Sequence, residues 1–241
     1  MVSVCMATYN GGAFVREQLE SILLQLPPDA EIVIADDDSV DETLSIISSF
    51  ADSRIRLLPA ESHLGVIHNY ERALRASRGE TVFLSDQDDI WLPGKVSMVL
   101  DALSEADLVT HDAWMLCPSG SSWIRTGRLS GIRPYRSGVA RNWWKNTFTG
   151  CCMAFRRHLL DASLPFPGKL PMHDQWLGLI AEKFFRVSYI AEPLVEYRQH
   201  SGNATHIGNS PAGILQKVKW RLDLAKALLS RKIGRCGVCP R

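Results

Sequence analysis

The first fifty residues contain the segment that decides the fold, VSVCMATYNGGAFVREQLESILLQLPPDAEIVIADDDSVDETLSIISSF (residues 2–50). It opens with an apolar run of strand length, residues 2–7, and continues with apolar residues at helical spacing over residues 11–26. A second strand-like run, residues 31–35, precedes another amphipathic helix pattern, residues 39–50. Strands that alternate with helices in this way predict a mostly parallel sheet covered on both faces.

The same alternation continues to residue 112 and supports an α/β fold. Pro93 stands where the first turn of a helix tolerates proline. In parallel sheets of this kind, ligands bind at the carboxyl ends of the strands. We expect further strands at residues 54–58, 80–85 and 107–112, and helices at residues 65–77 and 93–106.

The second half of the chain has a weaker pattern. Residues 116–146 are rich in Ser, Gly and Arg, and they predict a long irregular excursion. We interpret its five arginines as a solvent-exposed face, and the alternative is that they contact an anionic ligand. The five are Arg125, Arg128, Arg133, Arg136 and Arg141. Beyond it we expect a strand and a helix start at residues 150–160, a helix at 172–184, and two strands at 186–191 and 194–200.

Composition and charge exclude several classes of protein. The 241 residues carry a formal net charge of +1, whereas a dedicated nucleic-acid binder is usually basic, so we expect no nucleic-acid partner. The sequence has no run of about 18 apolar residues, so we expect no span across a bilayer. It also shows no basic region typical of a signal peptide, and we therefore expect a cytoplasmic location.

The six cysteines fit a reducing compartment. Cys5, Cys151 and Cys152 lie in apolar runs and are expected to be buried. Cys236 and Cys239 form a lone C-x-x-C, and a zinc site needs about four ligands, so a metal or redox role is not favoured there.

The segment after Pro211 predicts a basic amphipathic helix. Eight Lys and Arg residues lie between Ile214 and Arg241, against the single acid Asp223. The apolar face is expected either to dock on the chain's own domain or to lie on an anionic membrane, at the inner face of the plasma membrane. This face consists of Ile214, Leu215, Val218, Leu222, Ala225 and Leu229.

Polar clusters follow three of the predicted strands, at residues 7–12, 36–43 and 85–91. In the third cluster, Asp86 and Asp88 form a D-x-D pattern. Two acids at this spacing in an extended turn can face one hard cation, and Mg²⁺ and Mn²⁺ prefer carboxylate oxygens. The alternative is a solvated turn before a helix. The sequence has neither a G-x-x-x-x-G-K-[ST] loop nor a G-x-G-x-x-G after the first strand, which excludes a P-loop NTPase and the usual dinucleotide fold.

Six segments occur in the order of a known family, namely VSVCMATYNGGAFVREQLESILLQ, IADDDSVDET, FLSDQDDIWLPGK, GCCMAFRR, MHDQW and YRQHSGN. Together they resemble the family 2 inverting glycosyltransferases of the GT-A fold, in particular the rhamnosyltransferase-like group of bacterial surface-polysaccharide synthesis. The resemblance covers residues 1–205 and leaves residues 206–241 as a tail. It implies a nucleotide-sugar half, residues 1–112, and an acceptor half, residues 113–205.

The resemblance assigns the nucleotide contacts. Ala7, Thr8 and Tyr9 would line the base and the ribose. Asp37 would accept the N3–H of uracil or thymine, which favours a UDP-sugar or a dTDP-sugar donor, with dTDP-rhamnose among the candidates. The family usually has Gly where this chain has Asp38, and this departure puts the detail of the loop in doubt.

The resemblance also assigns the metal and the diphosphate. Asp88 would bind Mg²⁺ or Mn²⁺ directly, and Asp86 would contact the ribose or the water shell of the metal. His200 and Arg198 are candidates for contact with the metal or the diphosphate. Asp89 has no assigned role.

Asp174 matches the position of the catalytic base in the family. It would accept the proton of an attacking acceptor hydroxyl. Asp174 stands at the start of a predicted helix, where the helix dipole would favour the ionised form, and the alternative is a capping role alone. His173 would orient this base or touch the acceptor.

The resemblance implies a hexosyltransferase that moves a sugar, with inversion, from a nucleotide-sugar donor to a saccharide or lipid-linked saccharide acceptor. One alternative is a nucleotidyltransferase-like enzyme, which would carry a basic residue soon after the first strand, whereas the first one here is Arg16. Another is a non-catalytic binding module, which the presence of Asp88 and Asp174 argues against.

Overall fold

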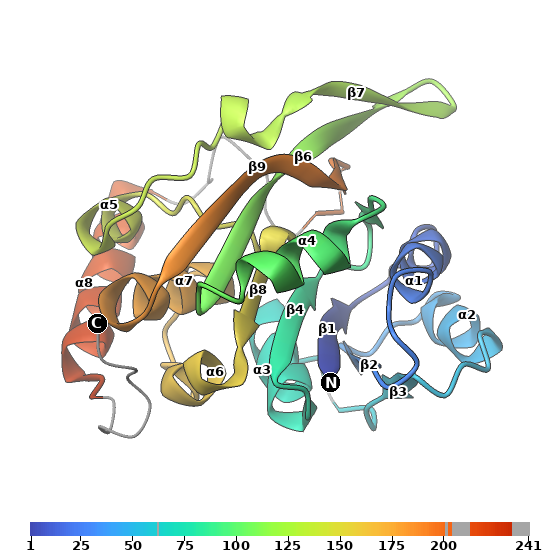
Figure 1. The fold of residues 1–241 in the computed structure, drawn as a ribbon, viewed down its shortest axis with the longest axis horizontal. Coiled ribbons are helices and arrows are strands. Elements are labelled where there is room, and N and C mark those ends of the chain that lie inside the picture. The colour runs from blue at the N-terminus through green and yellow to red at the C-terminus, as the bar shows by residue number, and fades with distance from the viewer. Residues whose placement is uncertain (62, 201, 204–212, 233–241) are drawn as a thin grey trace.

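The computed structural model of the chain describes residues 1–61, 63–200, 202–203 and 213–232, which form one mixed sheet with helices on both faces (Figure 1). Nine strands make up the sheet in the order β3-β2-β1-β4-β8-β6-β9-β5, with β7 paired to β6. The strands are β1 (Val2–Thr8), β2 (Glu31–Asp36), β3 (Ile55–Leu57), β4 (Thr81–Ser85), β5 (Ile90–Trp91), β6 (Leu108–Ser119), β7 (Ser122–Arg128), β8 (Met153–Arg156) and β9 (Val187–Arg198). The helices are α1 (Val15–Leu23), α2 (Thr43–Ser49), α3 (Val66–Ala76), α4 (Lys95–Ala102), α5 (Val139–Trp144), α6 (Arg157–Ser163), α7 (His173–Phe184) and α8 (Ile214–Ser230), with the short 3₁₀ turns η1 (Leu129–Gly131) and η2 (Gly150–Cys152).

The N-terminal part of the sheet is parallel, as the alternating pattern predicts. Strand β1 pairs in parallel with both β2 and β4, and β2 pairs in parallel with β3. The second part is mixed, because β8 runs antiparallel between β4 and β6. The α/β prediction is therefore confirmed, and the parallel strands bring their carboxyl ends to one edge.

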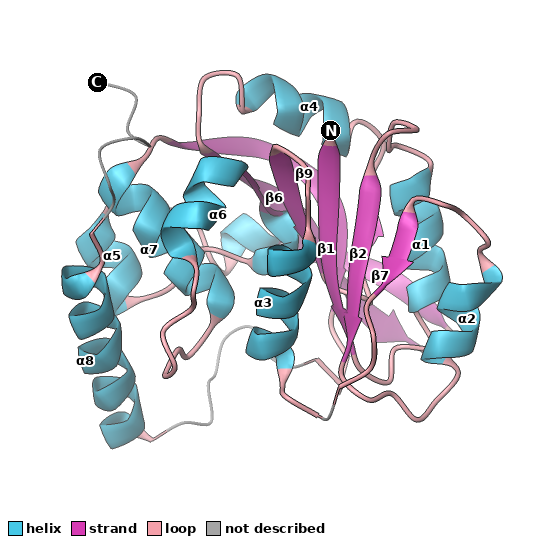
Figure 2. Ribbon diagram, turned by 90° about the horizontal axis from the view of Figure 1, so that it is seen from below, coloured by secondary structure: helices cyan, strands magenta, loops and turns pink. Residues whose placement is uncertain are grey.

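Apolar side chains on the two faces of each strand form two core layers. Met6 of β1 packs with Leu19 of α1 on the face that α1, α2 and α4 cover. Cys5, the next residue toward the N-terminus, packs with Leu74 of α3 on the opposite face, which also carries α6 and α7. Figure 2 shows these helix layers on either side of the strands. The expected burial of Cys5, Cys151 and Cys152 is confirmed.

The predicted irregular excursion at residues 116–146 is wrong in its first part. Strand β6 continues to Ser119 and pairs antiparallel with β7, which forms a hairpin that extends from the sheet (Figure 1). Almost every residue of β7 is exposed, so this strand lacks the apolar alternation that marks a half-buried strand. The exposure explains why the sequence pattern resembled a loop.

The two strands expected near the C-terminal end of the domain form the single strand β9. Pro193 stands where the pairing of β6 and β9 shifts register, opposite Asp112. Because proline cannot donate a hydrogen bond to a sheet, it is accommodated at such an irregularity. The two-residue strand β5 pairs with β9 and was not predicted. The expected boundary between the two halves, after residue 112, falls inside β6, and the division of the chain stays a prediction.

Helix α8 docks on the domain beside α5 and α7, with Leu224 and Leu228 buried. The docked face is therefore not the apolar face expected from the sequence, because Leu222 and Leu229 are exposed. Cys236 and Cys239 lie outside the described residues, as do residues 206–212 of the predicted tail. Across the described ranges, no helix combines the length and the apolar character needed to cross a bilayer.

Candidate active site

The carboxyl ends of β1, β2 and β4 bring the predicted nucleotide residues to one edge of the sheet. Thr8 stands opposite Asp36 in the register of β1 and β2, and Met6 stands opposite Ser85 in that of β1 and β4. Ala7 lies half-buried near the end of β1. We call this part of the site the donor edge.

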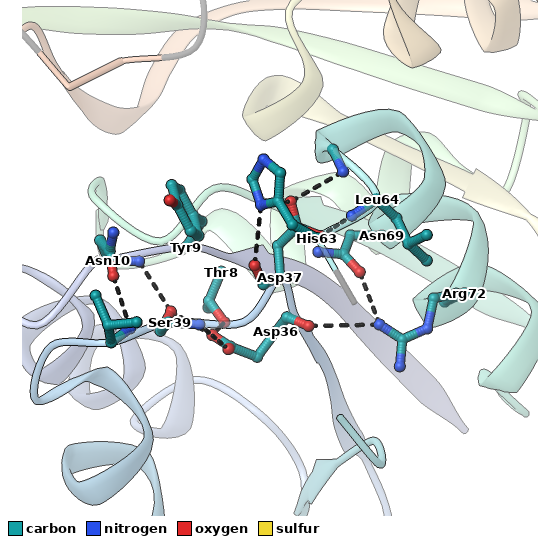
Figure 3. A network of polar contacts seen from close by, with 12 residues as sticks. Thr8, Tyr9, Asn10, Asp36, Asp37, Ser39, His63, Leu64, Asn69 and Arg72 are labelled. Carbon is teal, nitrogen blue, oxygen red and sulfur yellow. Dashed lines mark hydrogen bonds and ion pairs between the residues drawn. The ribbon is translucent and has the colours of Figure 1, made fainter. Parts of the chain in front are cut away.

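A network of polar contacts joins the two loops that follow β1 and β2 (Figure 3). Thr8 Oγ1 donates to Asp36 Oδ2 at 2.6 Å, and the same carboxylate accepts from the backbone N and the hydroxyl of Ser39. The backbone N of Asn10 in turn donates to Ser39 Oγ at 2.8 Å. Thr8 therefore fixes the shape of the donor edge from within, because its side chain is buried and already paired.

Asp37 holds the loop that precedes α3. Its carboxylate accepts from the backbone N of Leu64 at 2.7 Å and of Gly65 at 2.9 Å, and His63 Nδ1 lies 3.0 Å away (Figure 3). Each oxygen keeps a further lone pair for a ligand N–H. Asp38 has a φ of 69°, a left-handed conformation that glycine adopts more readily, so this chain places a side chain where the backbone favours Gly.

Two aromatic rings stand at the donor edge. Tyr9 is 47% exposed, and its ring centroid lies 4.7 Å from that of His63. Behind them, Asn69 of α3 is buried and accepts a hydrogen bond from Arg72 at 2.8 Å, while its Nδ2 has no partner among the described residues. Exposed aromatic faces beside a free amide donor suit a planar base and its carbonyl groups. His63 belongs to no sequence motif, and only the fold brings it here.

Gln87, the middle residue of the D-x-D pattern, ties β4 to the β1 loop. Its Oε1 accepts from the backbone N of Tyr9 at 2.9 Å, and its Nε2 donates to the carbonyl of Tyr9 at 3.0 Å. A Cβ on Gly11 would lie 2.2 Å from Oε1, so a larger residue at this position requires the Gln87 side chain to move. The sequence pattern alone predicts no role for Gln87.

Asp86 is a half-buried acid beside the end of β4. Its Oδ1 accepts a hydrogen bond of 2.6 Å from the hydroxyl of Tyr70, which lies on α3. Burial and the neighbouring charge of Asp88 raise the pKa of Asp86 to about 7. A cation between the two carboxylates would offset this repulsion.

Asp88 faces a set of ligand groups from the end of β9. Its Oδ2 lies 2.8 Å from His200 Nε2 and 3.1 Å from Asn203 Nδ2. The His200 ring stacks on Phe14 with centroids 4.5 Å apart, which fixes its direction. A carboxylate oxygen and an imidazole nitrogen this close can both bind one Mn²⁺ or Mg²⁺ in place of the hydrogen bond between them. The chemistry of Asp88 and His200 therefore suits the predicted cation.

Asp89 connects the D-x-D loop to β9. Its Oδ1 accepts from the backbone N of Arg198 at 3.1 Å, while burial and the charge of Asp88 raise its pKa. Ligand atoms of Asp86, Asp89 and Cys151 also lie within 4.8 Å of one another. This second set is the poorer site for a hard cation, because Asp89 and Cys151 are fully buried and substrate phosphates need access to the ion.

Arg198 lines an open pocket together with Phe14, Glu17 and Trp123. Its guanidinium forms an ion pair with Glu17 of α1 and lies 5.6 Å from the Phe14 ring centroid. The same contacts hold the end of β9 against the first turn of α1. Arg198 thus supports the position of His200, two residues further along the chain.

Asp174 lies in the first turn of α7 and is buried. Its Oδ1 accepts from Asn146 Nδ2 at 3.1 Å and from the backbone N of Gln175 at 2.5 Å. Burial raises the pKa of Asp174 above its ordinary value, and the positive charge of Arg133 opposes the rise. Burial therefore opposes the helix dipole, which favours the ionised form of Asp174. A base with a raised pKa accepts a proton more readily.

His173 links Asp86 to Asp174. Its ring stacks on Tyr70 with centroids 4.0 Å apart, and Tyr70 donates to Asp86. Burial lowers the pKa of His173 to about 3, so the ring is neutral. Neither ring nitrogen has a partner among the described residues. The stack therefore sets the spacing between Asp86 and Asp174, while the imidazole keeps hydrogen-bonding capacity.

Comparison with known proteins identifies the class to which this fold and site belong. The glycosyl transferase family 2 pattern matches residues 3–164, and the chain belongs to that family. The chain is 30% identical over 217 residues to the putative glycosyltransferase EpsH of Bacillus subtilis, covering 83% of the chain and 61% of that protein. It is 29% identical over 244 residues to the dTDP-rhamnosyl transferase RfbG of Shigella flexneri, covering 94% of the chain and 81% of that protein.

Solved structures confirm the GT-A fold. Staphylococcus aureus TarS 1-349 in complex with UDP-GlcNAc superposes with a TM-score of 0.72 at 20% identity, over 97% of this chain and 68% of that one. The mannosyltransferase PcManGT of Pyrobaculum calidifontis, in complex with GDP-Man and Mn²⁺, gives a TM-score of 0.65 at 23% identity, over 97% of this chain and 65% of that one.

Proposed function

We propose that this chain is an inverting glycosyltransferase that moves a sugar from a UDP-sugar or dTDP-sugar to a glycan or lipid-linked saccharide in the cytoplasm. One observation carries the proposal. Two acids lie on opposite sides of a rigid aromatic pair, since Asp86 bonds to Tyr70, which stacks on His173 beside Asp174. Asp86 belongs to the donor edge, and Asp174 would act on an acceptor.

The base and ribose would bind at the donor edge. Tyr9 and His63 offer ring faces, Asn69 Nδ2 is a spare donor, and Asp37 can accept an N3–H. Uracil and thymine both carry such an N–H between two carbonyl groups. The similarity to a dTDP-rhamnosyl transferase supports a dTDP-sugar within this class.

In the proposed reaction, an acceptor hydroxyl attacks the anomeric carbon from the face opposite the diphosphate. A new carbon–oxygen bond forms as the bond to the diphosphate oxygen breaks, and the electron pair leaves with the nucleoside diphosphate. Asp174 takes the hydroxyl proton, and its raised pKa makes it a stronger base for this step. A single displacement of this kind inverts the configuration of the sugar.

Asp88 and His200 would hold the divalent cation, with Asp86 supporting its water shell. A bound Mg²⁺ or Mn²⁺ supplies charge stabilisation for the departing diphosphate. The Mn²⁺ in the PcManGT complex supports the assignment of a metal. Asn203, which also bonds to Asp88, would orient this carboxylate.

The nucleotidyltransferase alternative receives no support from the contacts of Arg16. Its guanidinium bonds to Ser49 of α2 at 3.2 Å and lies over the ring of Phe50. A basic residue that cradled a triphosphate would instead have to face the strand ends.

Purified protein tests the proposed function through its response to donor nucleotides. We expect dTDP and UDP, with Mn²⁺, to raise the melting temperature of the wild type, because a ligand bound only by the folded state stabilises it. Asp88→Ala should lose this response, whereas Asp161→Ala, which changes an exposed acid of α6, should keep it. Sugar transfer from radiolabelled donors then distinguishes an enzyme from a binding module. An unchanged nucleotide response in Asp88→Ala contradicts the metal assignment.

A further inference from the structure

Helix α8 has a fixed orientation on the domain. Leu224 and Leu228 are buried against it, and Trp143 Nε1 donates to the carbonyl of Arg221 at 2.8 Å. Lys183 of α7 donates to the carbonyl of Leu228 at 2.6 Å. These contacts hold one face of α8 toward α5 and α7, so the opposite face turns outward.

The outward face carries a stripe of large apolar side chains. At 3.6 residues per turn, these apolar side chains lie within an arc of about 100° around the helix axis, and the arc excludes Leu224 and Leu228. Their side chains are between 45% and 87% exposed. A helix that only covered its own domain would place such residues against the core and polar residues outside. The outward stripe consists of Ile214, Leu215, Val218, Leu222 and Leu229.

Positive charges border the outward stripe on both sides. By the same helical spacing, Lys219 and Lys226 lie along one border, and Arg221 lies along the other. Asp223 is the one acid in the sequence of the helix. An apolar stripe between rows of Lys and Arg is typical of helices that lie in the interface of an anionic bilayer.

Trp144 of α5 extends this surface next to α8. It is 62% exposed, and the Arg221 guanidinium lies 4.1 Å from its ring centroid and donates to its carbonyl. Tryptophan prefers the headgroup region of bilayers. Trp144 is two residues from Asn146, which bonds to Asp174. The surface therefore adjoins the acceptor side of the candidate active site.

We propose that the outward stripe of α8, with Trp144, binds the surface of an anionic membrane. The side chains would enter the boundary between headgroups and acyl chains, while the flanking cations meet lipid phosphates. A second copy of the chain is a poorer occupant, because a symmetric contact would bring the cations of both helices together. The inference does not depend on the proposed transferase activity, although it would bring a lipid-linked acceptor close to Asp174.

Co-sedimentation with vesicles tests this inference on the full chain. We expect binding to phosphatidylcholine vesicles that contain phosphatidylglycerol, and at least about tenfold weaker binding to pure phosphatidylcholine. Salt at about 1 M shortens the Debye length to about 3 Å and should weaken the binding strongly. Equal binding to both vesicle types, or no binding to either, overturns the proposal.

Three variants locate the surface. Leu215→Glu combined with Leu222→Glu should reduce vesicle binding at least about tenfold, and Lys219→Glu combined with Lys226→Glu should do the same on anionic vesicles. Leu24→Glu, at the residue that follows α1, changes a leucine as exposed as Leu215 and should bind as the wild type does. Far-UV circular dichroism checks that each variant is folded. If the wild type instead forms a dimer that the leucine variant dissociates, without vesicle binding, the stripe is an interface between copies and the proposal fails.

Discussion

The two sides of the candidate active site are built differently. At the donor edge, the carboxylates of Asp36 and Asp37 accept hydrogen bonds from neighbouring loops, and Gln87 joins β4 to the β1 loop. Beside Asp174, more of the buried polar atoms are unpaired: His173 Nδ1, His173 Nε2 and Thr149 Oγ1 have no partner among the described residues, whereas at the donor edge Asn69 Nδ2 has none. Buried polar groups are normally paired. The difference fits the proposed function, in which the donor edge is largely preorganised and a hydroxyl-rich acceptor would complete the pairing on the other side.

The largest expected effect comes from removing the base on the acceptor side. Asp174→Asn keeps an oxygen that can accept from Asn146, but it cannot take a proton. We expect the turnover number for sugar transfer to fall about 10²- to 10⁴-fold, as is typical for loss of a general base. The melting-temperature shift given by UDP or dTDP with Mn²⁺ should remain, because the donor edge is intact.

The matched variant for this prediction is Asp161→Asn on α6, whose turnover should equal that of the wild type. Measuring both turnover and nucleotide response separates the two sides of the site. Near-normal transfer by Asp174→Asn would show that this acid has only a structural role in the first turn of α7.

The next effect concerns pH and the half-buried acid Asp86. Its pKa rises from an ordinary 3.8 to about 7 in the fold, so between these values the folded state binds more protons than the unfolded state. Asp86 therefore stabilises the fold least above pH 7, and its contribution falls as pH rises through this window. The pKa of His173 is lowered from an ordinary 6.5 to about 3, so between these values the unfolded state binds more protons than the folded state. The contribution of His173 to stability therefore rises with pH in this window.

Thermal melts of the wild type and Asp86→Asn isolate the Asp86 contribution. In chelator, the stability of the wild type relative to the variant should fall by up to a few kcal/mol as pH rises from about 4 to 8. Mn²⁺ should reduce this fall, because a cation favours the charged carboxylate. A wild type that gains stability relative to the variant as pH rises in chelator would contradict the assignment.

A smaller effect is expected where Gln87 meets Gly11. Gly11→Ala would place a Cβ 2.2 Å from Gln87 Oε1 and force that side chain from its contacts with Tyr9. We expect a loss of about 1–3 kcal/mol in the free energy of unfolding, measured with urea. Gly131→Ala, where a Cβ has open space, is the control. Adding Gln87→Ala should recover part of the loss, and a fully additive double variant would exclude the contact as its cause.

The sequence predicted the donor edge better than the acceptor side, for physical reasons. A parallel sheet places its strand ends together, so polar residues after apolar strands could be assigned to one edge before the structure was known. Asn146 and Thr149 lie in a segment without periodicity, and only tertiary packing brings Asn146 to Asp174. His63 reaches Tyr9 in the same way. Long-range contacts of this kind leave no local pattern.

The smallest effect tests the bond that connects the two sides. Tyr70→Phe removes the hydroxyl that donates to Asp86 Oδ1 and to the carbonyl of Ser85 while keeping the ring that stacks on His173. We expect the variant to lose about 1 kcal/mol of stability. The hydrogen bond from Tyr70 lowers the pKa of Asp86, so its removal should also move the pH midpoint of Mn²⁺-dependent nucleotide binding upward. Tyr135→Phe, which removes a hydroxyl bonded to Glu182, should cost similar stability and leave that midpoint unchanged. Equal pH profiles in both variants would mean that Tyr70 only packs between the two sides, and that the donor edge and the acceptor side are not coupled through its hydroxyl.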